Sequence, residues 1–120
     1  MDRIIIADLR LPTIVGVHPH ERTQKQDVNL RITLVADLRR AGRSDALQDT
    51  VDYQTLAGDI RALVENSQFF LIERLAHEVA RLCLRHAAVE SASIRLEKPG
   101  ALGGARTVAV EVERTRSDYA

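Results

Sequence analysis

The chain has little of three things on which whole classes of function depend. It contains one cysteine, Cys83, so it cannot form an internal disulfide. Aromatic residues make up only 3% of its 120 residues, and Lys plus Arg equal Asp plus Glu at 17 each. Because there is no basic excess and few aromatic side chains could stack on bases, the composition argues against nucleic-acid binding. The N-terminus has no long apolar run, so we expect neither a signal peptide nor a membrane span, and a cytoplasmic location.

The composition that remains is typical of a folded domain. Hydrophobic residues make up 45% of the chain and charged residues 28%, which are ordinary values for a soluble globular protein. The length suits one hydrophobic core, and no linker, repeat or low-complexity tract divides the sequence. We therefore expect a single domain over residues 1–120.

Four segments alternate apolar and polar residues or are rich in β-branched residues, as strands are. They are residues 3–11, 28–36, 91–97 and 107–113. The first runs into Pro12 and can continue through Val17. Residues 18–25 are polar and without periodicity, which predicts a long loop of the kind that is often functional. Residues 115–120 are expected to be a frayed tail.

Two segments between the second and third strands have the apolar spacing of amphipathic helices. In residues 54–66 the apolar face consists of Leu56, Ile60, Leu63 and Val64. After a break at residues 66–68, a second stripe consists of Ile72, Leu75, Ala76, Val79 and Cys83. Cys83 is therefore interpreted as a small core residue. The order ββααββ predicts an α+β fold: a four-stranded antiparallel sheet with both helices on one face.

Such a sheet leaves one face and two edges uncovered. We expect the uncovered face to carry Arg31, Thr33, Glu111 and Glu113. The first and last strands have no proline in their regular parts, so both edges would be open to pairing with another chain. Pairing with neighbouring subunits would remove both edges, which predicts a symmetric, ring-like homo-oligomer.

Lys98 follows the third strand and directly precedes Pro99-Gly100, a turn signal. A lysine at such a turn is usually a solvated surface group. Loops on rigid scaffolds also carry catalytic residues, however, so Lys98 is a candidate acid and base.

Four short motifs occur in order along the chain: Gly-Val-His-Pro-His-Glu at 16–21, Thr-Val-Asp-Tyr at 50–53, Phe-Leu-Ile-Glu-Arg-Leu-Ala at 70–76, and Lys-Pro-Gly-Ala at 98–101. Their order and spacing resemble dihydroneopterin aldolase of folate biosynthesis over nearly the whole chain. The resemblance implies the tunnelling fold, in which strands of neighbouring subunits form a barrel. It also implies an octamer of two tetrameric rings, with active sites between adjacent subunits.

The resemblance also implies roles for individual residues. Glu73 would bind the 2-amino and ring N–H groups of a pterin, a donor pair that a carboxylate matches, and the backbone of Ile72 would contact the same ring. Tyr53 would reach the pterin of a neighbouring subunit and offer its hydroxyl to the reacting side chain. Glu21 would bind the trihydroxypropyl chain or a catalytic water, and Lys98 would transfer protons.

Each of these residues also has a purely structural interpretation. An acidic residue such as Glu73 is favoured in a first helical turn by the helix dipole alone. Tyr53 would be an apolar cap on the first helix, and Glu21 a solvated loop carboxylate.

A lone lysine would suffice for the retro-aldol cleavage of dihydroneopterin that the resemblance implies. Carbon–carbon cleavage needs an electron sink, which other aldolases obtain from a lysine Schiff base or a metal ion. A dihydropterin supplies its own in the ring C=N bond, so the resemblance implies an aldehyde-lyase without cofactor, metal or Schiff base. His18 and His20 have no third partner of suitable spacing for zinc.

Two alternatives stay open. The related epimerase of dihydroneopterin triphosphate shares a glutamate, tyrosine, glutamate and lysine at comparable places, although the segment 98–101 looks more like the aldolase. The chain could also be a catalytically inactive pterin-binding subunit, against which the presence of Tyr53, Glu73 and Lys98 argues.

Overall fold

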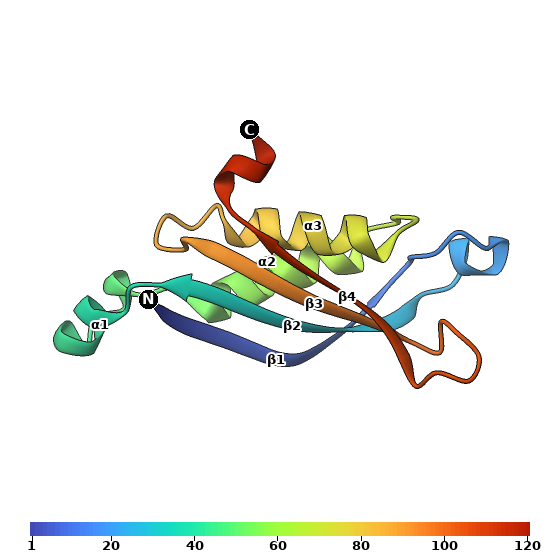
Figure 1. The fold of residues 1–120 in the computed structure, drawn as a ribbon, viewed down its shortest axis with the longest axis horizontal. Helices are drawn as coiled ribbons and strands as arrows, with labels where there is room; N and C mark the ends of the chain where they lie inside the picture. Colours follow the sequence, from blue (N-terminus) through green and yellow to red (C-terminus); the bar gives the residue numbers. More distant parts are fainter.

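The sheet consists of four antiparallel strands in the spatial order β1-β2-β3-β4 (Figure 1). The computed structural model describes residues 1–120. Its strands are β1 Asp2–Thr13, β2 Gln26–Ala36, β3 Ser91–Pro99 and β4 Thr107–Arg114. With the two main helices between β2 and β3, the predicted ββααββ order is confirmed.

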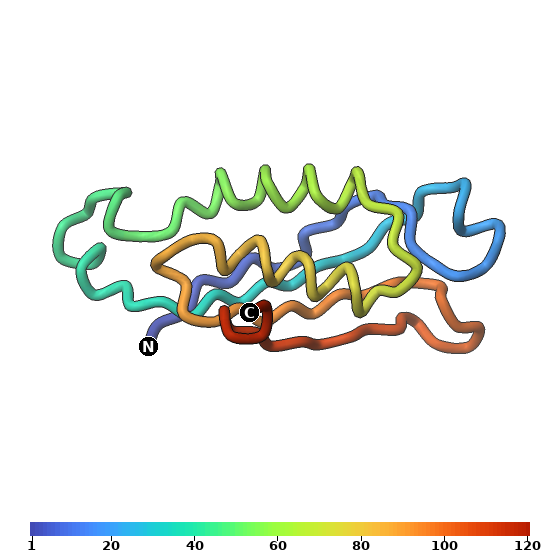
Figure 2. The backbone as a smooth tube through the Cα atoms, turned by 90° about the horizontal axis from the view of Figure 1, so that it is seen from above, coloured from blue at the N-terminus to red at the C-terminus, as the bar shows by residue number.

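The two main helices, α2 Tyr53–Glu65 and α3 Ile72–Cys83, lie side by side and antiparallel on one face of the sheet (Figure 2). Helix α2 begins where the Asp52 carboxylate accepts the Thr55 backbone N–H at 3.1 Å, a standard N-cap. Helix α3 lies across β3 and β4, and α2 across β1. None of the helices has the length and apolar character that crossing a bilayer requires.

The core lies between this helical layer and the sheet, and both predicted helix stripes contribute to it. Its largest fully buried side chains are Leu11, Leu30, Ile32, Leu34, Ile60, Leu75, Ile94 and Leu96. Cys83 is buried among them, as expected. Burial raises the pKa of its thiol to about 12, because the thiolate loses its hydration there.

The opposite face of the sheet is polar. Arg31, Glu111 and Glu113 are exposed there and Thr33 is half-buried, as the alternation predicts. The Arg95 guanidinium pairs with Glu111 across the strands at 2.6 Å. No element of this chain covers this face (Figure 1).

The predicted end and the predicted open edge of the first strand need correction. Strand β1 ends at Thr13 rather than Val17, and it includes Pro12, which is paired with Asp27. A register shift between Ile6 and Leu9, with Asp8 at a φ of 57°, forms a bulge in the same strand. Bulges and prolines are devices that blunt an edge strand, so the β1 edge is less open than the sequence suggested.

The C-terminal residues are not a frayed tail. Arg116–Tyr119 form a 3-10 helix, and the Tyr119 hydroxyl donates to the His77 carbonyl oxygen at 2.6 Å. The rings of Tyr119 and His77 lie 4.4 Å apart. The tail is therefore anchored on α3.

The sequence also gave no sign of α1 Arg39–Ser44 or of the 3-10 helix Leu47–Asp49. Both lie at the end of the molecule where α2 begins (Figure 1). The opposite end carries the β1–β2 loop, the start of α3 and the β3–β4 turn (Figures 1 and 2).

Candidate active site

A cavity of about 360 Å³ lies at this second end of the molecule. Three separate segments form its walls: the loop after β1, the start of α3, and the end of β3 with the β3–β4 turn. Four of the five predicted site residues, Glu21, Ile72, Glu73 and Lys98, line it. The fold thus brings together residues that are up to 77 positions apart in sequence.

Lys98 and Glu21 form an ion pair in this cavity. The Lys98 Nζ lies 2.5 Å from Glu21 Oε2, and the two side chains are only 12% and 10% exposed. Lys98 is not a turn residue as predicted, because β3 continues to Pro99, which pairs with Thr107. A lysine on a strand that is held by a neighbouring carboxylate is aimed more rigidly than one in a solvated loop.

Glu21 is held from three sides. It belongs to the 3-10 helix Pro19–Arg22, and its Oε1 accepts the backbone N–H of His18 at 3.2 Å. Its Oε2 accepts the Gln26 side-chain amide at 3.2 Å as well as Lys98. The hydrogen bond from Lys98, assisted by those from Gln26 and His18, lowers the pKa of Glu21 to about 2 against the opposing effect of burial. Glu21 is therefore ionised throughout the neutral range.

Gly16 makes room for the Glu21 carboxylate. A Cβ built on Gly16 would overlap the carboxyl group of Glu21, and the φ of Gly16 is +139°, a value that other residues rarely adopt. The Gly16 N–H also donates to the Phe69 carbonyl oxygen at 3.3 Å, which ties the loop after β1 to the segment before α3.

Glu73 stands in the first turn of α3 and faces the cavity as an exposed carboxylate. No hydrogen bond or ion pair within the chain engages its side chain. Ile72 precedes it as the first residue of the helix, where backbone N–H groups have no partner within the helix. Both residues are thus free to contact a ligand.

Tyr53 does not lie in this cavity. It is the first residue of α2 and 61% exposed. Helix α2 runs from Tyr53 toward the cavity end and is about 20 Å long, because each of its 13 residues adds a rise of about 1.5 Å. Helix α2 begins toward the end of the molecule that carries α1 (Figure 1), so its first residue, Tyr53, lies away from the cavity. One chain does not bring it together with Lys98.

Exposed apolar side chains surround the cavity. Of the large hydrophobic residues that are exposed, Val17, Phe70, Leu71 and Leu102 all line it, with exposed fractions of 60%, 61%, 50% and 59%. A cluster of this kind is typical of a surface that binds a ligand or another chain.

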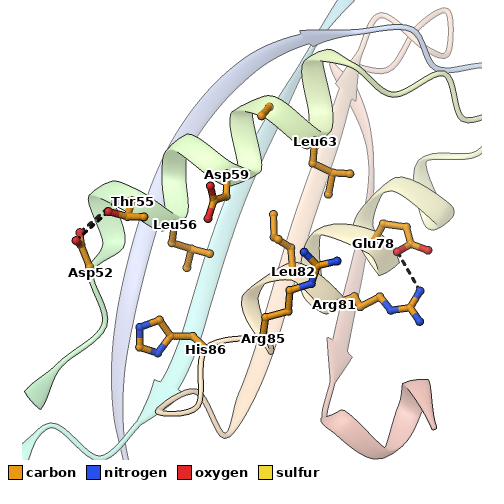
Figure 3. A pocket seen from close by; sticks show the side chains of 11 residues that line it. Asp52, Thr55, Leu56, Asp59, Leu63, Glu78, Arg81, Leu82, Arg85 and His86 are labelled. Atoms are coloured by element: carbon orange, nitrogen blue, oxygen red, sulfur yellow. Dashed lines mark hydrogen bonds and ion pairs between the residues drawn. The ribbon is translucent and has the colours of Figure 1, made fainter. Parts of the chain in front are cut away.

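A larger cavity of about 610 Å³ lies between α2 and α3 (Figure 3). Three of its charged groups have structural roles, because Asp52 caps α2 and Glu78 pairs with Arg81 as well as with Arg74. It contains none of the predicted site residues. We therefore place the candidate site at the smaller cavity, where the Lys98–Glu21 pair lies.

Comparison with known proteins agrees with this geometry. The family model of dihydroneopterin aldolase matches residues 4–113. The chain is 37% identical to the dihydroneopterin aldolase of Escherichia coli K12 over 95% of its own length and 93% of that protein. The chain belongs to the dihydroneopterin aldolase family.

Other relatives place this assignment in context. A solved structure of the E. coli dihydroneopterin aldolase in complex with neopterin superposes with a TM-score of 0.90 at 37% identity, covering 95% of this chain and 99% of that one. A folic acid synthesis protein of Dictyostelium discoideum is 38% identical over 96% of this chain, which spans 18% of that longer protein. A dihydroneopterin triphosphate 2′-epimerase of Pseudomonas aeruginosa is 33% identical over 92% of this chain and 89% of that protein.

Three functional candidates in this aldolase-family chain escaped the sequence analysis. Gln26 bonds Glu21, and Arg22 bonds the carbonyl oxygens of Gln68 and Phe69. Neither residue belongs to a sequence pattern that would indicate these contacts. Gly16 lies in one of the motifs, but its role depends on the position of Glu21. His18 and His20, considered above for zinc, are exposed and stack with ring centroids 5.8 Å apart.

Proposed function

We propose that this protein is a 7,8-dihydroneopterin aldolase, which cleaves its substrate to 6-hydroxymethyl-7,8-dihydropterin and glycolaldehyde. One observation carries the proposal: the Lys98–Glu21 ion pair and the free Glu73 carboxylate line one cavity. Membership of the aldolase family and the neopterin-bound E. coli neighbour support a pterin as the ligand.

Glu73 is the proposed anchor for the pterin ring. Its carboxylate can accept from the 2-amino group and the adjacent ring N–H together, a paired arrangement that favours one ring orientation. The apolar side chains of Val17, Leu71 and Leu102 around the cavity would contact the flat ring. This orientation would direct the side chain of the substrate toward Glu21 and Lys98.

Lys98 is the proposed proton-transfer group. The neutral amine of Lys98 would take the proton of the 2′-hydroxyl, directly or by way of water, as the bond between C1′ and C2′ breaks and glycolaldehyde leaves. The electron pair of that bond passes into the ring C=N, whose nitrogen takes up a proton to give an enamine. The Lys98 ammonium then returns a proton to C1′, and the ring nitrogen loses its proton as the C=N bond forms again. Glu21, ionised and bonded to Lys98, would keep the ammonium group aimed at the reacting side chain.

The proposed mechanism needs neither a metal ion nor a Schiff base, because the substrate ring accepts the electrons itself. The chain has only two lysines, Lys25 and Lys98, so a Schiff base is simple to test. Turnover should survive chelators, and borohydride added with substrate should leave the protein mass unchanged. A borohydride adduct on Lys98 would replace this mechanism with a covalent one.

We further propose a site between subunits of a ring-like homo-oligomer, the octamer expected from the resemblance. The separation of Tyr53 from the cavity supports this, since Tyr53 can serve only a neighbour's site. Inactive Tyr53→Phe and Lys98→Ala proteins, mixed after dissociation, should regain activity because some interfaces would combine both intact residues. Mixed oligomers without recovered activity, despite verified subunit exchange, would mean that Tyr53 has no part in catalysis. The cytoplasmic location expected from the sequence likewise stays a proposal.

The alternative activity is epimerisation of dihydroneopterin triphosphate, which the similarity to the P. aeruginosa epimerase favours. The deciding experiment incubates the pure protein with 7,8-dihydroneopterin and, separately, with its triphosphate. Glycolaldehyde from the first compound supports the aldolase. A changed side-chain stereocentre without cleavage would assign the epimerase, and binding without conversion would indicate an inactive pterin-binding subunit.

A further inference from the structure

Arg22 follows Glu21 directly, but its side chain serves the opposite wall of the cavity. Its Nη1 donates to the carbonyl oxygens of Gly16 at 2.9 Å and Phe69 at 3.0 Å. Its Nη2 donates to the carbonyl oxygen of Gln68 at 2.5 Å. One guanidinium thus bonds three backbone carbonyls on two different loops.

The two loops that Arg22 joins are the walls of the candidate site. Gly16 belongs to the loop after β1 that holds the Glu21 carboxylate. Phe69 belongs to the segment that leads into α3, where Glu73 stands. The Arg22 Cζ also lies 4.1 Å from the ring centroid of Phe70, whose exposed ring lies at the mouth of the cavity.

Few other hydrogen bonds join the two loops directly. The link from Gly16 N–H to the Phe69 carbonyl oxygen is 3.3 Å long, and that from the Thr13 hydroxyl to the Ser67 carbonyl oxygen is 3.4 Å. Both are at the long end for hydrogen bonds, whereas the Arg22 bonds are shorter and charge-assisted. A planar guanidinium can bond several carbonyls in fixed directions, which a lysine cannot do.

We propose that Arg22 is a positioning residue of the pterin site, which sets the distance between the Glu21–Lys98 pair and Glu73. The inference rests on the proposed function, because it assumes that one ligand contacts both walls. Arg22 itself does not line the cavity. Its loss should let the segment 68–71 shift, and displacements of about 1 Å can cost on the order of a hundredfold in a preorganised site.

The test measures neopterin affinity by titration for the wild type, Arg22→Ala, Arg22→Lys and a control, Arg61→Ala. Arg61 is an exposed arginine of α2 that pairs only with Glu65. Arg22→Ala should bind neopterin at least about tenfold more weakly, Arg22→Lys should recover little, and Arg61→Ala should match the wild type. If Arg22→Ala does not fold, Arg22→Lys carries the test, because it keeps the charge without the planar fork.

Chemical rescue separates positioning from mere stability. Guanidinium chloride at tens of millimolar, far below the molar concentrations that unfold proteins, should restore part of the affinity of Arg22→Ala, and equal sodium chloride should not. Unchanged affinity in Arg22→Ala, or lost affinity without rescue, would overturn the inference. A wild type that does not bind neopterin would contradict the proposed function and remove the basis of the inference with it.

Discussion

Gly16→Ala should damage the site and the stability of the fold together. The new Cβ would overlap the Glu21 carboxylate, and alanine would have to adopt a φ of +139°. Backbone strain in such a region costs about 1–3 kcal/mol. Displacing Glu21 also breaks its charge-assisted bonds, each worth roughly 1.5–3 kcal/mol. Part of this loss is regained when the two charges meet water, so we expect a total destabilisation of about 2–5 kcal/mol.

Gly58 offers a matched control for this substitution. It lies within α2, its φ is not positive, and a Cβ there would meet nothing within 4 Å. Gly58→Ala should therefore stabilise the protein by about 0.5–1 kcal/mol, as alanine does within helices.

Urea unfolding at one protein concentration, together with the rate of glycolaldehyde formation, measures both effects. Gly16→Ala should lose stability and nearly all activity, while Gly58→Ala keeps its activity. A Gly16→Ala protein with wild-type stability and turnover would refute the account of how Glu21 is seated. Equal damage from both substitutions would show that the effect is not specific to the cavity.

Three further predictions concern single side chains. Glu73→Gln should weaken neopterin binding by about 1–3 kcal/mol, because one acceptor becomes an amide that faces a ring donor; unchanged affinity in a titration would return Glu73 to a helix-start role. The pKa of Glu21 is lowered from 4.5 to about 2, so its stabilising effect is complete above about pH 4.5 and is lost as the pH falls toward 2. Between pH 5 and pH 3, the unfolding free energy of the wild type should therefore fall more than that of Glu21→Gln, and parallel losses would count against the ion pair. Cys83, buried and with a raised pKa, should resist thiol reagents until the protein unfolds, and rapid labelling of the native protein would contradict its place in the core.

Much of the fold was predictable because its signals are local. The alternation in β2 and the apolar stripes of α2 and α3 determine which residues face the core, and those faces are buried as expected. Helix α1 was missed because its six residues, Arg39–Ser44, bury no side chain and so show no stripe. The anchored tail was missed because it depends on contacts with residues distant in sequence: Tyr119 with His77, and Arg116 with the His86 carbonyl oxygen.

The end of β3 shows why a local turn signal can mislead. Pro99 suggested that the strand stops before Lys98, since proline lacks the N–H of a sheet ladder. The pairing of β2 with β3 ends at Asn29 and Glu97, however, while β3 and β4 stay paired to Pro99 and Thr107. Beyond Glu97, β3 has only one neighbouring strand, so proline is tolerated and Lys98 remains on a strand.

The candidate site was predictable as a set of residues but not as a geometry. The motifs indicated Glu21, Ile72, Glu73 and Lys98, and the fold places all four in one cavity. The ion pair of Lys98 with Glu21 could not be read from the sequence, because it depends on how β3 and the β1–β2 loop meet in space. The separation of Tyr53 from the cavity likewise follows only from the length and direction of α2.

The central claim is that Lys98 transfers protons in a pterin site whose recognition depends on other residues. The most direct measurement compares glycolaldehyde formation from 7,8-dihydroneopterin, and neopterin affinity, in the wild type, Lys98→Ala and Lys25→Ala. Lys25 is the other lysine, and it donates to the Glu65 carbonyl oxygen outside the candidate cavity. We predict that Lys98→Ala loses turnover by on the order of a hundredfold or more while it still binds neopterin, and that Lys25→Ala keeps both. A Lys98→Ala protein with more than about a tenth of wild-type turnover, well short of the loss expected for an acid–base group, would contradict the account.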